Sequence, residues 1–163
     1  MPNVPAKNQA GVELARIAYK GELPAGLTHA DCDAALTVLN AEATPLNERY
    51  PGFKSVSEDK ITEAMSQSPE AAQMYEALKM IGRKVMPMAS EDVAQHWIGS
   101  IIAALSDLPA SVSVPAIKAA IHVAIPEPWR VETVIREKAV DVERRHWLAK
   151  HRLEMFKRQI DAA

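Results

Sequence analysis

The chain has 163 residues, about the size of one domain, and 48% of them are hydrophobic while 25% are charged. This composition is typical of a soluble globular protein and argues against wholesale disorder. The formal net charge of -2 at pH 7 predicts no general attraction to nucleic acid or membranes, so any such attraction must be local.

The first two predicted helices are bounded by residues with clear start and stop chemistry. Apolar residues recur at helical spacing over residues 7–20, and Gly21 and Pro24 end that helix. Thr28 caps the next helix, with Asp31 three residues on as a short capping box. The inner face of this second helix carries Cys32, Ala35, Leu36 and Leu39.

The next three predicted helices each start at a serine. Ser57 begins a brief helix. Ser68, followed by Pro69, begins a well-marked helix that Pro87 ends, because proline suits a first turn and breaks an interior. Ser90 begins a helix with an apolar face broad enough to be mostly buried.

The stretch from Ser106 to Pro115 is the one place with strand-like alternation. Its residues 111–114 alternate serine and valine between two prolines, which is too short for a convincing strand. We therefore expect an extended connector there, followed by a short helix that starts at Ser113 or Pro115 and runs to Ala124.

The last predicted helix is unusually long. From Trp129 to about Ile160 the chain has no Gly or Pro, which predicts about 30 helical residues and a length of about 45 Å. Its far half carries an apolar stripe that should either pack on a second copy or dock on the chain itself. That stripe consists of Ala149, Leu153, Phe156 and Ile160.

These elements predict an all-α protein, an irregular bundle of about six helices with a long C-terminal helix. We expect residues 1–128 to form the bundle and residues 129–163 to form a long basic helix that packs on, or projects from, the same domain.

The segment from Arg144 to Arg158 is locally basic, with six Lys or Arg residues against Glu154 alone, about +5. It is a candidate contact surface for a partner or for phosphates, and the alternative is a solvated helix end that the macrodipole favours. The candidate contact residues are Arg144, Arg145, Trp147, Lys150, His151, Arg152, Phe156, Lys157 and Arg158.

Other combinations of reactive side chains are better explained by structure than by chemistry. Glu143 and His146 have the spacing of a di-iron ligand pair, but that site requires a second such pair. The cluster from His29 to Asp33 belongs at a helix start, with Cys32 as a small buried residue. Phosphate-binding glycine loops and hydrolase or zinc motifs are missing from the sequence. We therefore predict no enzyme activity, no catalytic residues, no cofactor and no metal.

Residues 90–139 combine Trp97 followed by Ile101 and Leu105, a turn at residues 106–109, and short segments at 116–120 and 132–139. In this pattern of sizes and turns the chain resembles small all-helical phage and prophage proteins of the replication-accessory or helicase-loader type. The resemblance implies a role in a replication or nucleic-acid-processing complex.

The expected function is therefore that of a non-enzymatic adaptor or inhibitor that docks on a larger protein. Direct nucleic-acid binding through the basic C-terminal helix is the alternative, and a homodimer remains open. One cysteine and the lack of a leader-like or membrane-spanning stretch predict a reducing, cytoplasmic location and no membrane contact.

Overall fold

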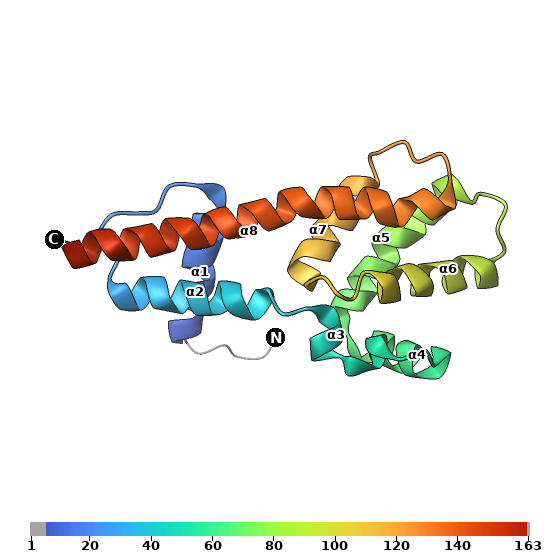
Figure 1. The fold of residues 1–163 in the computed structure, drawn as a ribbon, viewed down its shortest axis with the longest axis horizontal. Helices are drawn as coiled ribbons and strands as arrows, with labels where there is room; N and C mark the ends of the chain where they lie inside the picture. The colour runs from blue at the N-terminus through green and yellow to red at the C-terminus, as the bar shows by residue number, and fades with distance from the viewer. Residues whose placement is uncertain (1–5, 163) are drawn as a thin grey trace. The chain divides into compact units, whose positions relative to one another are not determined.

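The computed structural model describes residues 6–162, and the regular elements in that range are all helical (Figure 1). The predicted all-α class is confirmed, with eight α-helices where about six were expected. The helices are α1 (Ala6–Lys20), α2 (His29–Glu42), α3 (Leu46–Arg49), α4 (Glu58–Gln67), α5 (Pro69–Val85), α6 (Glu91–Ala104), α7 (Ala110–Ala120) and α8 (Val131–Ala162), with short 3-10 turns at Pro51–Lys54 and Pro128–Arg130.

Three of the predicted helix starts are confirmed by capping hydrogen bonds, whereas Ser57 precedes α4 without a side-chain cap bond. Thr28 and Asp31 form the reciprocal capping box, in which Thr28 N–H donates to the Asp31 carboxylate and Asp31 N–H donates to the Thr28 hydroxyl, at 2.9 and 3.2 Å. Ser68 and Ser90 each accept a hydrogen bond from the backbone N–H three residues on, at 3.1 and 3.3 Å. These bonds satisfy N–H groups that have no partner within the helix itself.

The chain forms two compact units. The terminal unit comprises the chain up to Glu42 and from Glu143 onward, and the middle unit comprises residues Ala43–Val142. Helix α8 contributes its first turns to the middle unit and its remaining turns to the terminal unit. The expected division after residue 128 stays a prediction.

The middle unit has a continuous apolar core built mainly from α5, α6, α7 and the first turns of α8. A short antiparallel backbone contact lies beside this core. In it, Leu46 and Asn47 donate backbone hydrogen bonds to the Leu108 and Ser106 carbonyls. The largest fully buried side chains here are Leu46, Met74, Leu78, Ile81, Ile98, Ile102, Leu105, Ile117, Val131 and Ile135.

Arg136 joins α8 to the C-terminal end of α6. Its guanidinium donates to both carboxylate oxygens of Asp107, at 2.8 and 3.1 Å, and to the Ala104 carbonyl at 2.9 Å. A further bond reaches Glu132 on the same helix. The hydrogen bonds from Arg136 lower the pKa of Asp107. A bidentate guanidinium–carboxylate contact of this kind fixes the relative orientation of the two side chains as well as the distance between them.

The connector expected over residues 106–115 is wrong in its second half, because α7 begins at Ala110. Val112, Ser113 and Val114 are all buried, and Ser113 donates to the sulfur of Met74 at 3.7 Å. Ser113 is buried together with Val112. Because serine is polar, a search for regularly spaced apolar residues does not detect this buried side of the helix. Proline is normally unfavourable inside a helix, and Pro115 lies on the exposed side of α7. Burial of its neighbours outweighs this local preference of proline.

The terminal unit has a separate apolar core in which the second half of α8 packs on α1 and α2. Of the stripe predicted on this part of α8, Ala149, Leu153 and Phe156 dock on the chain itself, whereas Ile160 lies outside this core. Its core residues are Leu14, Ala15, Ala18, Cys32, Ala35, Leu39, Ala149 and Leu153. Within residues 6–162, none of the helices is long and apolar enough to span a membrane.

Replacement of Leu153 by Ala tests this packing. Leu153 is fully buried, so Leu153→Ala should lower the free energy of unfolding by about 2 to 5 kcal/mol, measured by urea denaturation. Met155→Ala is the matched control, because Met155 is partly exposed two residues away, and it should cost about 0.5 kcal/mol or less. Equal losses in the two variants would contradict the packing of α8 in this unit.

Candidate functional site

Burial of one stripe fixes the rotation of α8 about its own axis in the terminal unit. Ala149 and Leu153 are completely buried against α1 and α2, and Phe156 packs partly buried at the edge of the same core. Successive helical residues are about 100° apart, so this stripe determines which other side chains of α8 point outward.

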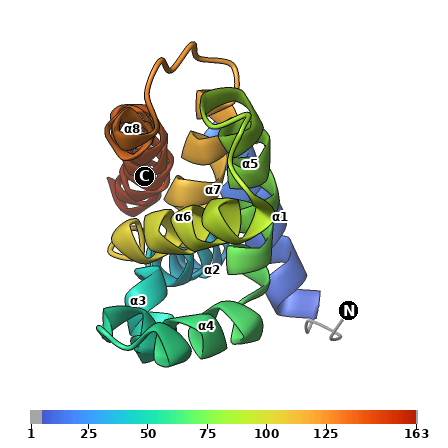
Figure 2. The same cartoon turned by 90° about the vertical axis from the view of Figure 1, so that its right-hand side faces the viewer.

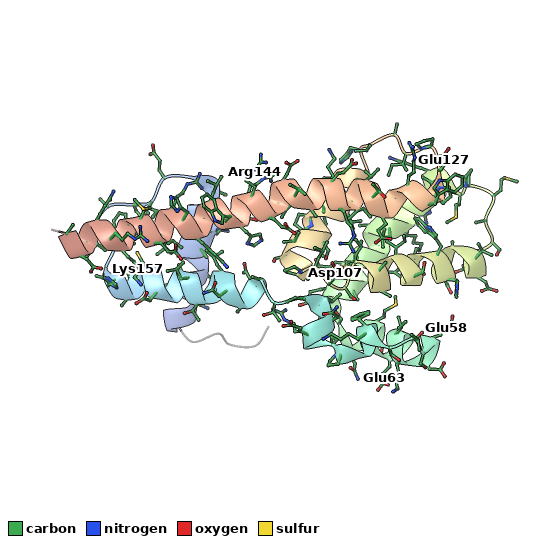
Figure 3. All side chains as sticks on the ribbon, viewed as in Figure 1. Glu58, Glu63, Asp107, Glu127, Arg144 and Lys157 are labelled. Carbon is green, nitrogen blue, oxygen red and sulfur yellow. The ribbon has the colours of Figure 1, made fainter. Side chains whose placement is uncertain are left out.

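Two of the predicted contact residues make structural bonds within the unit. Arg152 donates to the Ala18 carbonyl in the last turn of α1, at 2.8 Å, and so satisfies a helix-end acceptor. Lys157 donates to Asp33 on α2, and Figure 3 shows its side chain on the α2 side of α8. This bond lowers the pKa of Asp33 and raises that of Lys157.

Arg145 and Lys150 lie at the flanks of the buried stripe. Burial raises the pKa of the Tyr19 hydroxyl to about 12, while the nearby positive charge of Arg145 acts in the opposite direction. The Tyr19 ring meets the His146 ring edge to face at 4.8 Å. Lys150 is half-buried. Arg145 is exposed, so both residues contribute positive charge beside the outward face.

The outward face of α8 in the terminal unit includes Arg144, Trp147, His151, Met155 and Arg158, and the exposed Glu154 lies beside them. Their spacing of three or four residues places them in one row along the helix. Trp147 is 60% exposed, and its ring stacks on that of His151 with centroids 4.9 Å apart and planes 8° from parallel. Arg158 lies against the Met155 sulfur at 3.9 Å, and Figure 3 shows Arg144 at the edge of α8 opposite Lys157.

A hollow of about 550 Å³ lies beside this face, between α8 and the loop that follows α1. Gly21 begins that loop with φ +142°, a conformation that favours glycine and turns the chain away from α1. The hollow has apolar and basic walls with a single carboxylate. It is lined by Gly21, Glu22, Leu23, His151, Arg152, Met155, Phe156 and Gln159.

The nine predicted contact residues therefore fall into groups. The structure brings Arg144, Trp147, His151 and Arg158 together on the outward face. Arg152 and Phe156 line the neighbouring hollow, Lys157 is turned toward α2, and Arg145 and Lys150 lie at the flanks.

Sequence reasoning missed Met155 and the Glu22–Leu23 wall of the hollow. Met155 lies four residues after His151 and eight after Trp147, so helical spacing could have found it. The wall comes from a loop more than a hundred residues away in sequence, and no local pattern indicates its position.

The described residues contain no group of three His, Cys, Asp or Glu side chains arranged to hold a metal ion. Cys32 is a free thiol in the core of the terminal unit, as the sequence predicted for a small buried residue, and its burial raises its pKa.

No protein-family model matches the chain, and comparison with curated proteins and with solved structures found no significant match.

The Asp33 contact with Lys157 predicts a measurable titration. The midpoint of the Asp33 carboxyl, followed by carbon NMR, should lie below its ordinary value of 3.8, because Lys157 stabilises the charged form. Lys157→Met should move that midpoint back up toward the ordinary value. The stabilisation is present above the ordinary carboxyl pKa and is lost as the pH falls through the lowered pKa.

Arg158→Met, which removes one positive charge from the outward face, is the control and should leave the Asp33 midpoint nearly unchanged. A midpoint that does not move in Lys157→Met would show that Lys157 is available to a partner.

Proposed function

We propose that the protein is a non-enzymatic adaptor or inhibitor that docks on a larger protein through the outward face of α8 and the neighbouring hollow. The partner surface offers carboxylates around an apolar or aromatic side chain. The carboxylates meet Arg144 and Arg158, and the apolar side chain enters the hollow beside Met155 and Phe156. The resemblance to phage replication-accessory proteins suggests a partner in a replication or nucleic-acid-processing complex in the cytoplasm.

The observation that carries this proposal is the exposed Trp147. A tryptophan that leaves most of its surface in water costs free energy that docking recovers, at about 25 cal/mol per Å² of apolar area. Trp and Arg are the residue types that most often dominate binding energy at protein interfaces, and Met is also enriched there. Arg144, Trp147 and Met155 supply all three types on one helix face.

Direct nucleic-acid binding through the same face is the second candidate. The stacked rings of Trp147 and His151 form a flat aromatic surface of the kind that receives an unpaired base. The charge available there is smaller than the sequence suggests, because Arg152 and Lys157 are directed to acceptors within the unit. Affinity for phosphates depends on the number of cations that reach them, so a protein partner is favoured.

Capture of partners from the source cell tests the proposal with two exposed tryptophans. Trp147→Ala should abolish capture of a specific protein, because it removes the anchor of the interface. Trp129→Ala is the matched control: Trp129 is 75% exposed but lies in the middle unit, and its loss should leave capture intact. The captured protein is then purified and titrated against both variants by calorimetry.

Nucleic acid is tested in parallel with a labelled duplex and a labelled poly-dT strand at about 150 mM salt. The adaptor predicts weak binding to both, and a variant with Arg144, Arg145 and Arg158 replaced by Glu should change it little. Tight nucleic-acid binding that this variant loses, with a helical circular dichroism spectrum retained, would replace the adaptor with the second candidate.

A further inference from the structure

A second candidate surface lies in the middle unit, between α4 and α6. These helices lie one above the other in Figures 1 and 2, and a groove of about 610 Å³ runs between them. Tyr75 of α5 contributes to its wall. The groove is lined by Val56, Glu58, Ile61, Thr62, Met65, Tyr75, Asp92, Gln95, His96, Gly99, Ser100 and Ala103.

The two ends of the groove differ in chemistry. At one end Glu58 and Asp92 stand exposed, and the Glu58 carboxylate meets His96 Nδ1 at 3.1 Å. At the other end Met65 lies beside Gly99. The described lining includes these two carboxylates and neither lysine nor arginine. These two ends favour an occupant that is cationic at one end and apolar at the other.

The dimensions of the groove suit a helix. The lining residues of α6 recur about once per turn from Asp92 to Ala103, a span of about 16 Å or three helical turns. Gly99, Ser100 and Ala103 are small, and small residues at a contact let two helix axes approach closely. A helix with apolar residues at i, i+3, i+4 and i+7 covers such a span.

The direction of an incoming helix follows from the dipoles. Glu58 faces His96 and Met65 faces Gly99, so α4 and α6 run the same way and both begin at the acidic end. The C-terminus of a helix carries partial negative charge and favours cations, whereas an N-terminus carries partial positive charge. A helix that runs antiparallel to α4 and α6 brings its basic C-terminal turn to Glu58 and Asp92.

We propose that this groove binds an amphipathic helix of a partner protein, with an apolar face and Lys or Arg residues in its C-terminal turn. The apolar face covers Ile61, Met65 and Tyr75, and the basic turn meets Glu58 and Asp92. This site is separate from the face of α8, uses opposite charge, and does not depend on the function proposed for that face.

The test uses the full chain and a labelled synthetic peptide of about 14 residues, with leucines at i, i+3, i+4 and i+7 and lysines in its last turn. Fluorescence anisotropy at about 150 mM salt should show saturable binding with a dissociation constant on the order of micromolar. A peptide with the same leucines and glutamates in the last turn should bind at least about tenfold more weakly.

Charge reversal within the groove has a matched control on the same helix. Glu58→Lys with Asp92→Lys should weaken binding of the lysine peptide by about tenfold or more, because attraction becomes repulsion. Asp59→Lys with Glu63→Lys makes the same change in net charge outside the groove lining, and Figure 3 shows Glu63 on the side of α4 away from α6. This control should keep affinity within about threefold, since screening weakens its influence.

A size change at Gly99 tests the groove itself. An added Cβ would lie 3.8 Å from the Met65 sulfur, an ordinary contact, so Gly99→Ala should fold and bind like the wild type. Gly99→Leu fills the groove and should abolish binding while the thermal melt stays cooperative.

The proposal would be overturned if both pairs of charge reversals weakened binding equally. It would also be overturned if the two peptides bound with equal affinity, or if folded Gly99→Leu bound the lysine peptide fully. A wild-type dimer in sedimentation that Gly99→Leu converts to a monomer would overturn it as well, because a second copy would then be the occupant.

Discussion

The apolar stripe of α8 decides which of its basic residues a partner can reach. Ala149 and Leu153 are buried against α1 and α2, and this burial fixes the rotation of the helix in the terminal unit. Residues that flank the stripe meet acceptors within the unit, as Arg152 and Lys157 do. Residues opposite the stripe, with Trp147 at their centre, point to solvent. A helix segment that is mostly basic in sequence is thus divided by packing into a side with structural contacts and a side exposed to solvent.

Much of the fold follows from local chemistry, and the failures show where that chemistry ends. The capping box of Thr28 and the serine caps were predictable, because each involves residues three apart in sequence. The start of α7 was not, since Ser113 is a polar residue in a buried stripe and only the surrounding core makes its position clear. The bonds of Arg152 and Lys157 join residues more than 120 positions apart, which no spacing rule detects. Helical periodicity could nevertheless have shown that Trp147 and Phe156 lie on opposite faces of the helix.

Charge is distributed differently in the two units. The sequence places ten basic and thirteen acidic residues in the middle unit, against nine basic and eight acidic in the remainder. The proposed surface of the terminal unit is basic and aromatic, whereas the proposed groove of the middle unit is acidic and apolar. Two surfaces of opposite charge select different partners, because like charges brought together at an interface are repulsive. The two proposals together describe an adaptor, a chain that holds two proteins at once.

The most direct test of the α8 surface is site-specific photo-crosslinking in the source cell, with a photoreactive residue at position 151 on the outward face and, as control, at exposed position 76 on α5. The proposed docking predicts one discrete protein adduct from position 151 that nuclease treatment leaves intact and that the control position does not give. An adduct that nuclease removes would contradict a protein partner and identify the outward face of α8 as a nucleic-acid-binding surface.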